Sequence, residues 1–207
     1  MSIRNEDSGD DVGDQVLDAA RACLVRSDGR KVTIAEVARE AGVSRPTVYR
    51  RWPDMAELLR ALLTREVAGV VAAVTGTTPL RTRGADDLDA TTDQVVRVVA
   101  ALRDDELVAA LWREQRDFMT PYVFDRFGTS QLGVLDVLTQ MVARGQEREQ
   151  IRDGDPRKLA SMVLLMAQTA IQSRALVESI LGDDWRGELH HALASYLRAD
   201  DDSPATA

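Results

Sequence analysis

Cysteine is almost absent from this chain, since Cys23 is the single thiol in 207 residues. One cysteine excludes an internal disulfide and a metal cluster built on cysteine ligands. Proline is scarce as well, at six residues, and no run of about 18 uncharged apolar residues offers a membrane span. The opening segment, MSIRNEDSGDDVGD, is too acidic and polar for a secretory signal. These absences predict a cytoplasmic protein that is rich in helices and has no membrane partner.

Motifs that carry catalysis are also missing. The sequence contains no glycine-rich phosphate loop and no nucleophile motif. His190 and His191 are adjacent and therefore point about 100° apart on a helix, so they cannot share a metal ion as residues i and i+4 would. The carboxylates are scattered along polar faces. We therefore expect no catalytic residues, no metal site and no cofactor.

The net charge of −8 argues at first sight against a nucleic-acid partner. Between Lys31 and Trp52, however, five basic side chains stand against two acidic ones, a net of +3 that leaves −11 on the rest of the chain. The distribution matters more than the sum, because a basic patch can hold DNA while an acidic body repels it. The alternative interpretation is a chance fluctuation of surface charge.

The stretch VTIAEVAREAGVSRPTVYRRW, residues 32–52, predicts two short helices joined by a tight turn. Thr33 can cap the first helix, with Glu36 closing a capping box. One apolar stripe then recurs at helical spacing, and its members are Ile34, Val37, Ala38 and Ala41. Gly42 follows, and it can adopt the left-handed conformation of a helix C-terminus at little steric cost.

The second of these helices combines a buried side with a polar one. Ser44 is its expected N-cap, and Pro46 fits the first turn, where a missing N–H costs nothing. Val48 and Trp52 point into a core. The remaining positions face outward: Ser44, Arg45, Thr47, Tyr49, Arg50 and Arg51. The pattern is that of a helix-turn-helix whose second helix presents arginines to solvent.

The rest of the chain is predicted to be helical, giving an all-α fold of about nine helices. We expect helices over residues 11–27, 54–74, 92–102, 104–117, 121–144, 156–181 and 185–197. Thr120-Pro121 and Asp155-Pro156 have the pattern of helix starts, and Gly145 that of a C-terminal stop. Residues 75–91, rich in Gly, Pro and short polar side chains, form the clearest break.

The segment TIAEVAREAGVSRPTVYRRWPDMAELL, residues 33–59, resembles the TetR family of transcriptional regulators, with one helix before it and a long one after it. The resemblance implies a DNA-binding head, a connector helix and a larger helical body that binds a ligand and dimerises. On that basis we expect a disordered segment over residues 1–10, a helix-turn-helix domain over 11–53, a connector over 54–74, a body over 75–199 and a disordered tail over 200–207.

The family implies a homodimer that binds an operator in double-stranded DNA. Two reading helices about 34–36 Å apart require a roughly palindromic site. The expected DNA-binding residues are Thr33, Ser44, Arg45, Pro46, Thr47, Tyr49, Arg50 and Arg51. Arg45 and Arg50 are the candidates for reading bases, because a guanidinium matches guanine O6 and N7. The hydroxyls of Thr33, Ser44, Thr47 and Tyr49, together with Arg51, suit phosphate.

One position departs from the family. Met55 stands where the family usually has a phosphate-binding lysine at the start of its fourth helix. Weaker DNA binding, or help from Lys31, would follow. For each residue of the head the alternative role is a solvated surface side chain or, for Thr33 and Ser44, a plain helix cap.

The sequence of the body, residues 75–199, identifies its binding residues less clearly than that of the head does. Candidates for lining an apolar or amphipathic effector site are Trp112, Phe118, Tyr122, Met141, Met162 and Met166, and ordinary core packing explains each of them as well. Candidates for the dimer interface on the last helices are Leu159, Val163, Ala167, Ala170, Leu176 and Leu193. We expect a ligand-responsive repressor. The alternatives are an activator and a helix-turn-helix protein that no longer binds DNA and acts as an adaptor or ligand sponge.

Overall fold

The computed structural model describes residues 7–76, 87–124 and 127–199. This part of the chain is helical, as predicted, and its one extended pairing is an isolated bridge between Ile151 and Arg198. Within the described ranges no helix is both long and apolar enough to traverse a bilayer. The chain divides into two compact units, and the division does not follow chain order.

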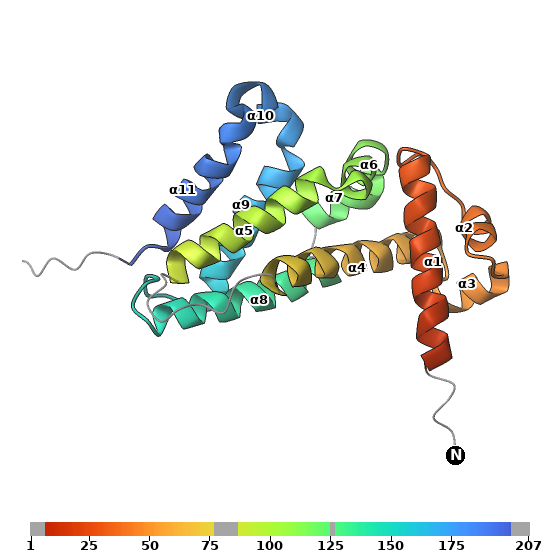
Figure 1. Ribbon diagram of the computed structural model, residues 1–207, viewed down its shortest axis with the longest axis horizontal. Helices are drawn as coiled ribbons and strands as arrows, with labels where there is room; N and C mark the ends of the chain where they lie inside the picture. The colour runs from red at the N-terminus through yellow and green to blue at the C-terminus, as the bar shows by residue number, and fades with distance from the viewer. Residues whose placement is uncertain (1–6, 77–86, 125–126, 200–207) are drawn as a thin grey trace, which may run out of the picture. The chain divides into compact units, whose positions relative to one another are not determined.

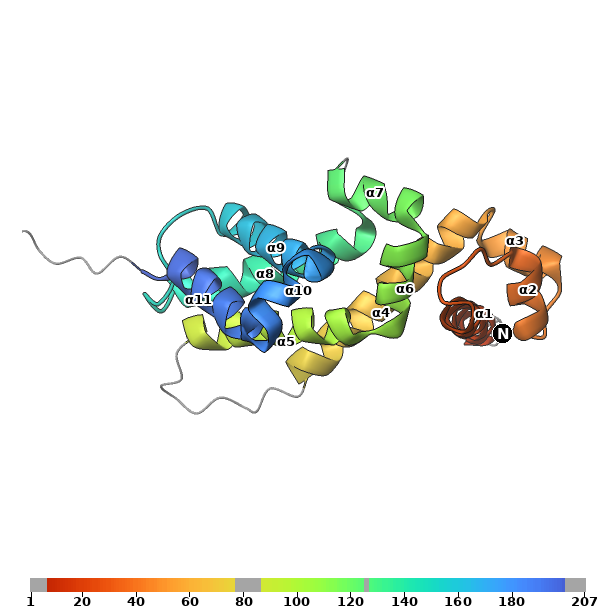
Figure 2. The ribbon, with the colours of Figure 1, turned by 90° about the horizontal axis from the view of Figure 1, so that it is seen from above.

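Unit 1 comprises residues 1–67 and 104–130. Its helices are α1 (Asp7–Arg26), α2 (Ile34–Glu40), α3 (Arg45–Arg51), the first part of α4 (Met55–Gly76), α6 (Glu106–Glu114) and α7 (Arg116–Phe124). Figures 1 and 2 show α2 and α3 together along one side of α1. The fully buried side chains at the centre of this unit include Leu24, Val37, Val48, Leu58 and Leu62, and Leu107 and Leu111 of α6 join the same core.

Unit 2 comprises residues 68–103 and 131–207. Its helices are α5 (Asp87–Asp104), α8 (Thr129–Gln146), α9 (Pro156–Gln172), α10 (Arg174–Leu181), the 3-10 turn η1 (Gly182–Asp184) and α11 (Trp185–Leu197), with the end of α4. Its core is built around Val99, Val142, Val163, Leu193 and Leu197.

Several predicted helix ends were wrong. α1 begins at Asp7, inside the segment expected to be disordered, and the other residues of that segment, 1–6, lie outside the described ranges. α5 is longer than predicted, at Asp87–Asp104. Thr120-Pro121 does not start a helix, because the chain already turns at Gln115 and α7 runs from Arg116 through Pro121 to Phe124.

Gly145 and Ser173 also differ from the prediction. Gly145 lies inside α8, where it is required for packing, because a Cβ there would collide with Ile151. The helix predicted over residues 156–181 is interrupted at Ser173, where α9 ends and α10 begins. The carbonyl of Ala170, which a continuous helix would bond to the Arg174 N–H, instead accepts a 2.6 Å hydrogen bond from the Arg103 side chain. The break at Ser173, together with the separation of α7 from α8, is the reason that the described chain holds more helices than the nine expected.

Candidate nucleic-acid interface

The first helix of the predicted pair is held at its start by a reciprocal cap. Thr33 accepts a hydrogen bond from the Glu36 N–H at 3.3 Å, and the Thr33 N–H and hydroxyl both donate to the Glu36 carboxylate at 2.8 Å. These bonds hold the pKa of Glu36 below its usual value, the Thr33 side chain contributing most. The capping box predicted from the sequence is confirmed.

The turn and the second helix are equally well defined by local chemistry. Gly42 adopts the left-handed conformation expected of it, with φ of 65°. Ser44 caps α3 by accepting from the Thr47 N–H at 3.3 Å, and the two hydroxyls are hydrogen-bonded at 2.8 Å. The turn is also tied to α1, because the Gln15 side chain donates to the Ala41 carbonyl at 2.9 Å.

The orientation of α3 agrees with the sequence prediction. Val48 is fully buried, and Trp52 is half-buried against the same core. The side chains on the other side are exposed: Ser44, Arg45, Pro46, Tyr49, Arg50 and Arg51, with Thr47 half-buried. The short helix α3 therefore presents a polar face with cationic groups at the surface of unit 1.

Two of the predicted contact residues are already engaged within the chain. The guanidinium of Arg51 lies against Gly13 of α1, where any added Cβ would collide with it. The donors of Thr33 are occupied by the Glu36 carboxylate, so a phosphate would have to displace an anion that the protein supplies itself. Among the predicted phosphate contacts, these two are therefore less suited to DNA than Ser44, Thr47 and Tyr49.

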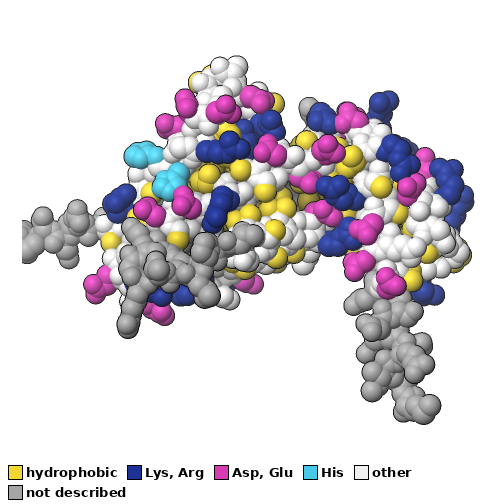
Figure 3. All heavy atoms as spheres, in the orientation of Figure 1, with side chains coloured by type: hydrophobic (Ala, Val, Ile, Leu, Met, Phe, Trp, Pro, Cys, Tyr) yellow, Lys and Arg dark blue, Asp and Glu magenta, His cyan; other side chains and the backbone are white. Residues whose placement is uncertain are grey.

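The electrostatics of the head favour Arg45 and Arg50, the two other arginines among the predicted contacts, as DNA-binding residues. Both acidic side chains of the basic segment have partners, Glu36 in the cap and Glu40 with Arg26 at 2.7 Å. The hydrogen bond and the charge of Arg26 hold the pKa of Glu40 below its usual value. Among the described residues no ion pair neutralises Arg45 or Arg50. Figure 3 shows basic side chains at the surface of unit 1, interleaved with acidic ones.

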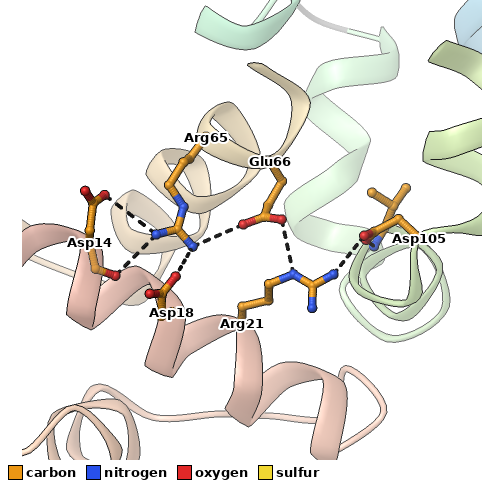
Figure 4. A network of polar contacts seen from close by, with 7 residues as sticks. Asp14, Asp18, Arg21, Arg65, Glu66 and Asp105 are labelled. Carbon is orange, nitrogen blue, oxygen red and sulfur yellow. Dashed lines mark hydrogen bonds and ion pairs between the residues drawn. The ribbon is translucent and has the colours of Figure 1, made fainter. Parts of the chain in front are cut away.

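Met55, the residue that replaces the family's usual lysine, is half-buried and packs against the core of unit 1. Sequence reasoning also missed Gln15, Gly13 and an ion-pair network around Arg21 (Figure 4). Helical spacing gave no signal for any of the three, because their partners are distant in sequence.

The effector candidates do not meet in one unit. Trp112 and Phe118 pack against the core of unit 1, whereas Met141 is buried in unit 2 and Met166 packs against the same core. Met162 is 41% exposed, and the side chain of Tyr122 lies outside the described residues.

The dimer candidates are mostly core residues of the single chain. Leu159, Val163, Ala167 and Leu193 are buried in unit 2, so they have little surface left to offer a partner. Ala170 is partly buried against the same core, and Leu176 is 78% exposed. The buried candidates of α9, namely Leu159, Val163 and Ala167, therefore pack within unit 2 of the single chain.

Comparisons with known proteins address the identity of the chain. The family model described as "Bacterial regulatory proteins, tetR family" matches residues 16–62. An uncharacterized HTH-type transcriptional regulator of Mycobacterium tuberculosis is 42% identical over 198 residues, which cover 95% of this chain and 99% of that protein. The HTH-type transcriptional regulator AqdR of Rhodococcus erythropolis is 45% identical over 64 residues, which cover 30% of this chain and 31% of that protein.

Solved structures share the fold. The crystal structure of RolR in complex with resorcinol has a TM-score of 0.69 at 16% identity, covering 94% of this chain and 91% of that one. The transcriptional repressor QsdR of R. erythropolis has a TM-score of 0.63 at 17% identity, covering 91% and 95%. With its head, its helical architecture and a relative that matches almost end to end, the chain belongs to the TetR family of helix-turn-helix transcriptional regulators.

Proposed function

We propose that this regulator is a repressor that binds a palindromic operator as a homodimer and releases it when a small molecule binds. The observation that carries the proposal is the exposed polar face of α3, on which Arg45 and Arg50 have no ion pair among the described residues. Binding to a bacterial operator would place the protein in the cytoplasm.

In this proposal α3 enters the major groove, where each guanidinium can pair with guanine O6 and N7. The hydroxyls of Ser44, Thr47 and Tyr49 would bind the phosphate backbone and fix the register of the helix. Pro46 would make only apolar contact. The cap on α3 supports this role, because a helix that is already ordered loses little entropy on binding.

We propose a dimer interface on the exposed apolar side chains of α9 and α10 rather than on the buried stripe. Met162 and Leu165 of α9 are 41% and 47% exposed, and Leu176 and Ile180 of α10 are 78% and 79% exposed. Leu176 and Ile180 lie four residues apart and so share one face of α10. Large aliphatic side chains left this exposed on one helix face are typical of an interaction surface.

The effector is proposed to be small and apolar or amphipathic. The aromatic and methionine side chains of the chain support this proposal, as does the fold shared with RolR, whose structure contains resorcinol. Met141 and Met166 are the candidate lining residues in unit 2, and Trp112 and Phe118 are those in unit 1. An effector can shift operator binding only by its difference in affinity for the free and DNA-bound forms.

A gel-shift assay and footprinting with the DNA that flanks the protein's own gene test the proposal. The wild-type chain should protect a palindromic site, and the variant Arg45→Ala/Arg50→Ala should lose it while remaining folded and dimeric. An activator would bind the same DNA but raise transcription in a reporter strain. If the wild-type dimer binds neither the flanking DNA nor randomised duplexes, the result supports the adaptor or ligand-sponge alternative instead.

A further inference from the structure

A single arginine of unit 2 contacts the chain on both sides of α10. Arg103, near the C-terminal end of α5, donates from Nη1 to the Ala170 carbonyl in the last turn of α9 at 2.6 Å. Its guanidinium carbon also lies 4.0 Å from the ring centre of Trp185, which is the first residue of α11. Figure 1 shows α10 at the bend between α9 and α11. Arg103 therefore joins the point where the chain enters this bend to the point where it leaves.

A second bond runs in the opposite direction across the same junction. Nη1 of Arg174, the first residue of α10, donates to the Arg103 carbonyl at 2.7 Å. Arg103 and Trp185 are both 7% exposed, so water competes little for their contacts. We call the contacts of Arg103 with Ala170, Arg174 and Trp185 the Arg103 clasp.

α10 has little packing of its own to fix its direction. It is eight residues long, none of its residues is buried, and no side chain caps its start. A helix this short is marginally stable in water without tertiary contacts. Leu181, its last residue, packs against the core of unit 2. The direction of the first turn of α10 therefore depends on the Arg103 clasp.

The two sides of α10 have different roles. Arg174 and Glu178 lie four residues apart on one side and form an ion pair at 3.4 Å. Leu176 and Ile180 are each offset from them by two residues, which is about 200° around a helix, so they lie on the opposite side. These two side chains are 78% and 79% exposed. The clasp holds α10 by its polar side and leaves its apolar side to a partner.

We propose that Arg103 and Arg174 are positioning residues of the dimer interface, which fix the angle at which α10 presents Leu176 and Ile180 to a second copy of the chain. A second copy fits this surface, because across a two-fold axis the same aliphatic pair of each protomer can pack on the other, as an isologous contact requires. This inference rests on the proposed homodimer.

The angle matters because the proposed interface spans the junction between two helices. Met162 and Leu165 are exposed on α9, before the break at Ser173, and the apolar side of α10 comes after it. If α10 swings about Ser173, a partner that packs on α9 loses its contact with α10. The clasp keeps both helices in the arrangement that one partner can meet.

Arg174→Met opens the clasp with little risk to folding. The Arg174 side chain is 42% exposed, and methionine keeps part of its apolar stem while removing the donors. Glu178→Gln is the matched control, because it removes the same Arg174–Glu178 ion pair but leaves the bond to the Arg103 carbonyl in place. Arg174→Lys is the conservative variant, since an ammonium group can still donate to that carbonyl. Sedimentation equilibrium of the full-length proteins measures the dimer dissociation constant, and circular dichroism measures the helix content.

We expect Arg174→Met to raise the dimer dissociation constant about tenfold, because two protomers that each hold α10 correctly about a third of the time are both competent in about a ninth of encounters. Arg174→Lys should restore most of the affinity, Glu178→Gln should leave it unchanged, and the helix content of all three should match that of wild type. The proposal is overturned if Arg174→Met dimerises as tightly as wild type, or if Arg174→Met and Glu178→Gln weaken the dimer equally.

These measurements contain no DNA, so they are separate from the test of operator binding. A wild-type dimer that bound no operator would contradict the proposed function, and the dissociation constants of the variants would still decide the role of the clasp. A wild-type chain that stayed monomeric at every concentration would overturn the proposed dimer and this inference together.

Discussion

The guanidinium of Arg51, the last residue of α3, lies against Gly13, near the N-terminal end of α1. The family model begins at residue 16, so this contact uses a part of α1 that the model does not include. The absence of a side chain on Gly13 is what makes room for the guanidinium. We therefore predict that Arg51 packs α3 on α1 rather than binding phosphate.

Arg51→Ala should therefore leave the salt dependence of DNA binding nearly unchanged. Removing a residue that contacts phosphate lowers the slope of log K against log salt by about 1, and we expect no such decrease for Arg51→Ala. Titrations at four salt concentrations measure the slopes. A decrease of about 1 for Arg51→Ala would return Arg51 to the phosphate contacts.

Arg50→Ala should relax sequence preference without affecting the dimer. A bidentate contact to guanine is worth about 1–3 kcal/mol of discrimination at one base pair, so selection from randomised duplexes should show one position losing its preference in each half-site. Sedimentation verifies that the dimer persists. An equal loss of affinity on every sequence would reassign Arg50 to the phosphate backbone.

The cap between Thr33 and Glu36 predicts a pH dependence of stability. The hydrogen bonds from the Thr33 side chain and backbone lower the pKa of Glu36 in the folded state from 4.5. Their contribution is therefore fully present above the unfolded pKa and is lost as the pH falls through the lower folded value. Urea unfolding between neutral and acid pH should show a smaller loss of stability for Glu36→Gln than for wild type. If the stability of the two proteins depended on pH in the same way, the hydrogen bonds from Thr33 would not favour the ionised form of Glu36.

The features that the sequence predicted well are those decided by neighbours in the chain. The caps at Thr33 and Ser44 and the left-handed Gly42 depend on residues three positions apart or fewer, and each is present in the structure. The burial of Val48 follows from the same local periodicity. These features define the head and hence the family.

The features that the sequence missed depend on distant partners. The break at Ser173 is accompanied by the bond from Arg103 to the Ala170 carbonyl, 67 positions away, and the link from Arg21 to Asp105 spans 84 positions. No pattern within one helix contains that information. For the same reason the sequence assigned Leu159, Val163 and Ala167 of α9 to a dimer interface, whereas the core of unit 2 already covers them.

Arg103 should be a strong determinant of the stability of unit 2. It is 7% exposed, lies 4.0 Å from the ring centre of Trp185 and donates to Ala170 at 2.6 Å. Arg103→Met should cost about 2–4 kcal/mol, because a charged hydrogen bond and a cation–π contact are lost together. Arg186→Met is the control, since that arginine lies over the same ring at 5.1 Å but is exposed. If the two variants lowered the free energy of unfolding in urea equally, Arg103 would not have the special contribution to stability assigned to it here.

The dimer surface can be tested by separating exposed from buried apolar residues. Leu176→Glu/Ile180→Glu should convert the dimer to a monomer without loss of helix, because both side chains are more than three-quarters exposed and α10 buries none of its residues in the single chain. Leu159→Ala should instead lower the free energy of unfolding by about 2–5 kcal/mol, the usual effect of truncating a buried leucine. Light scattering after gel filtration, with circular dichroism and urea melts, distinguishes the two outcomes. A Leu176→Glu/Ile180→Glu protein that remained dimeric would place the interface elsewhere on unit 2 or on unit 1.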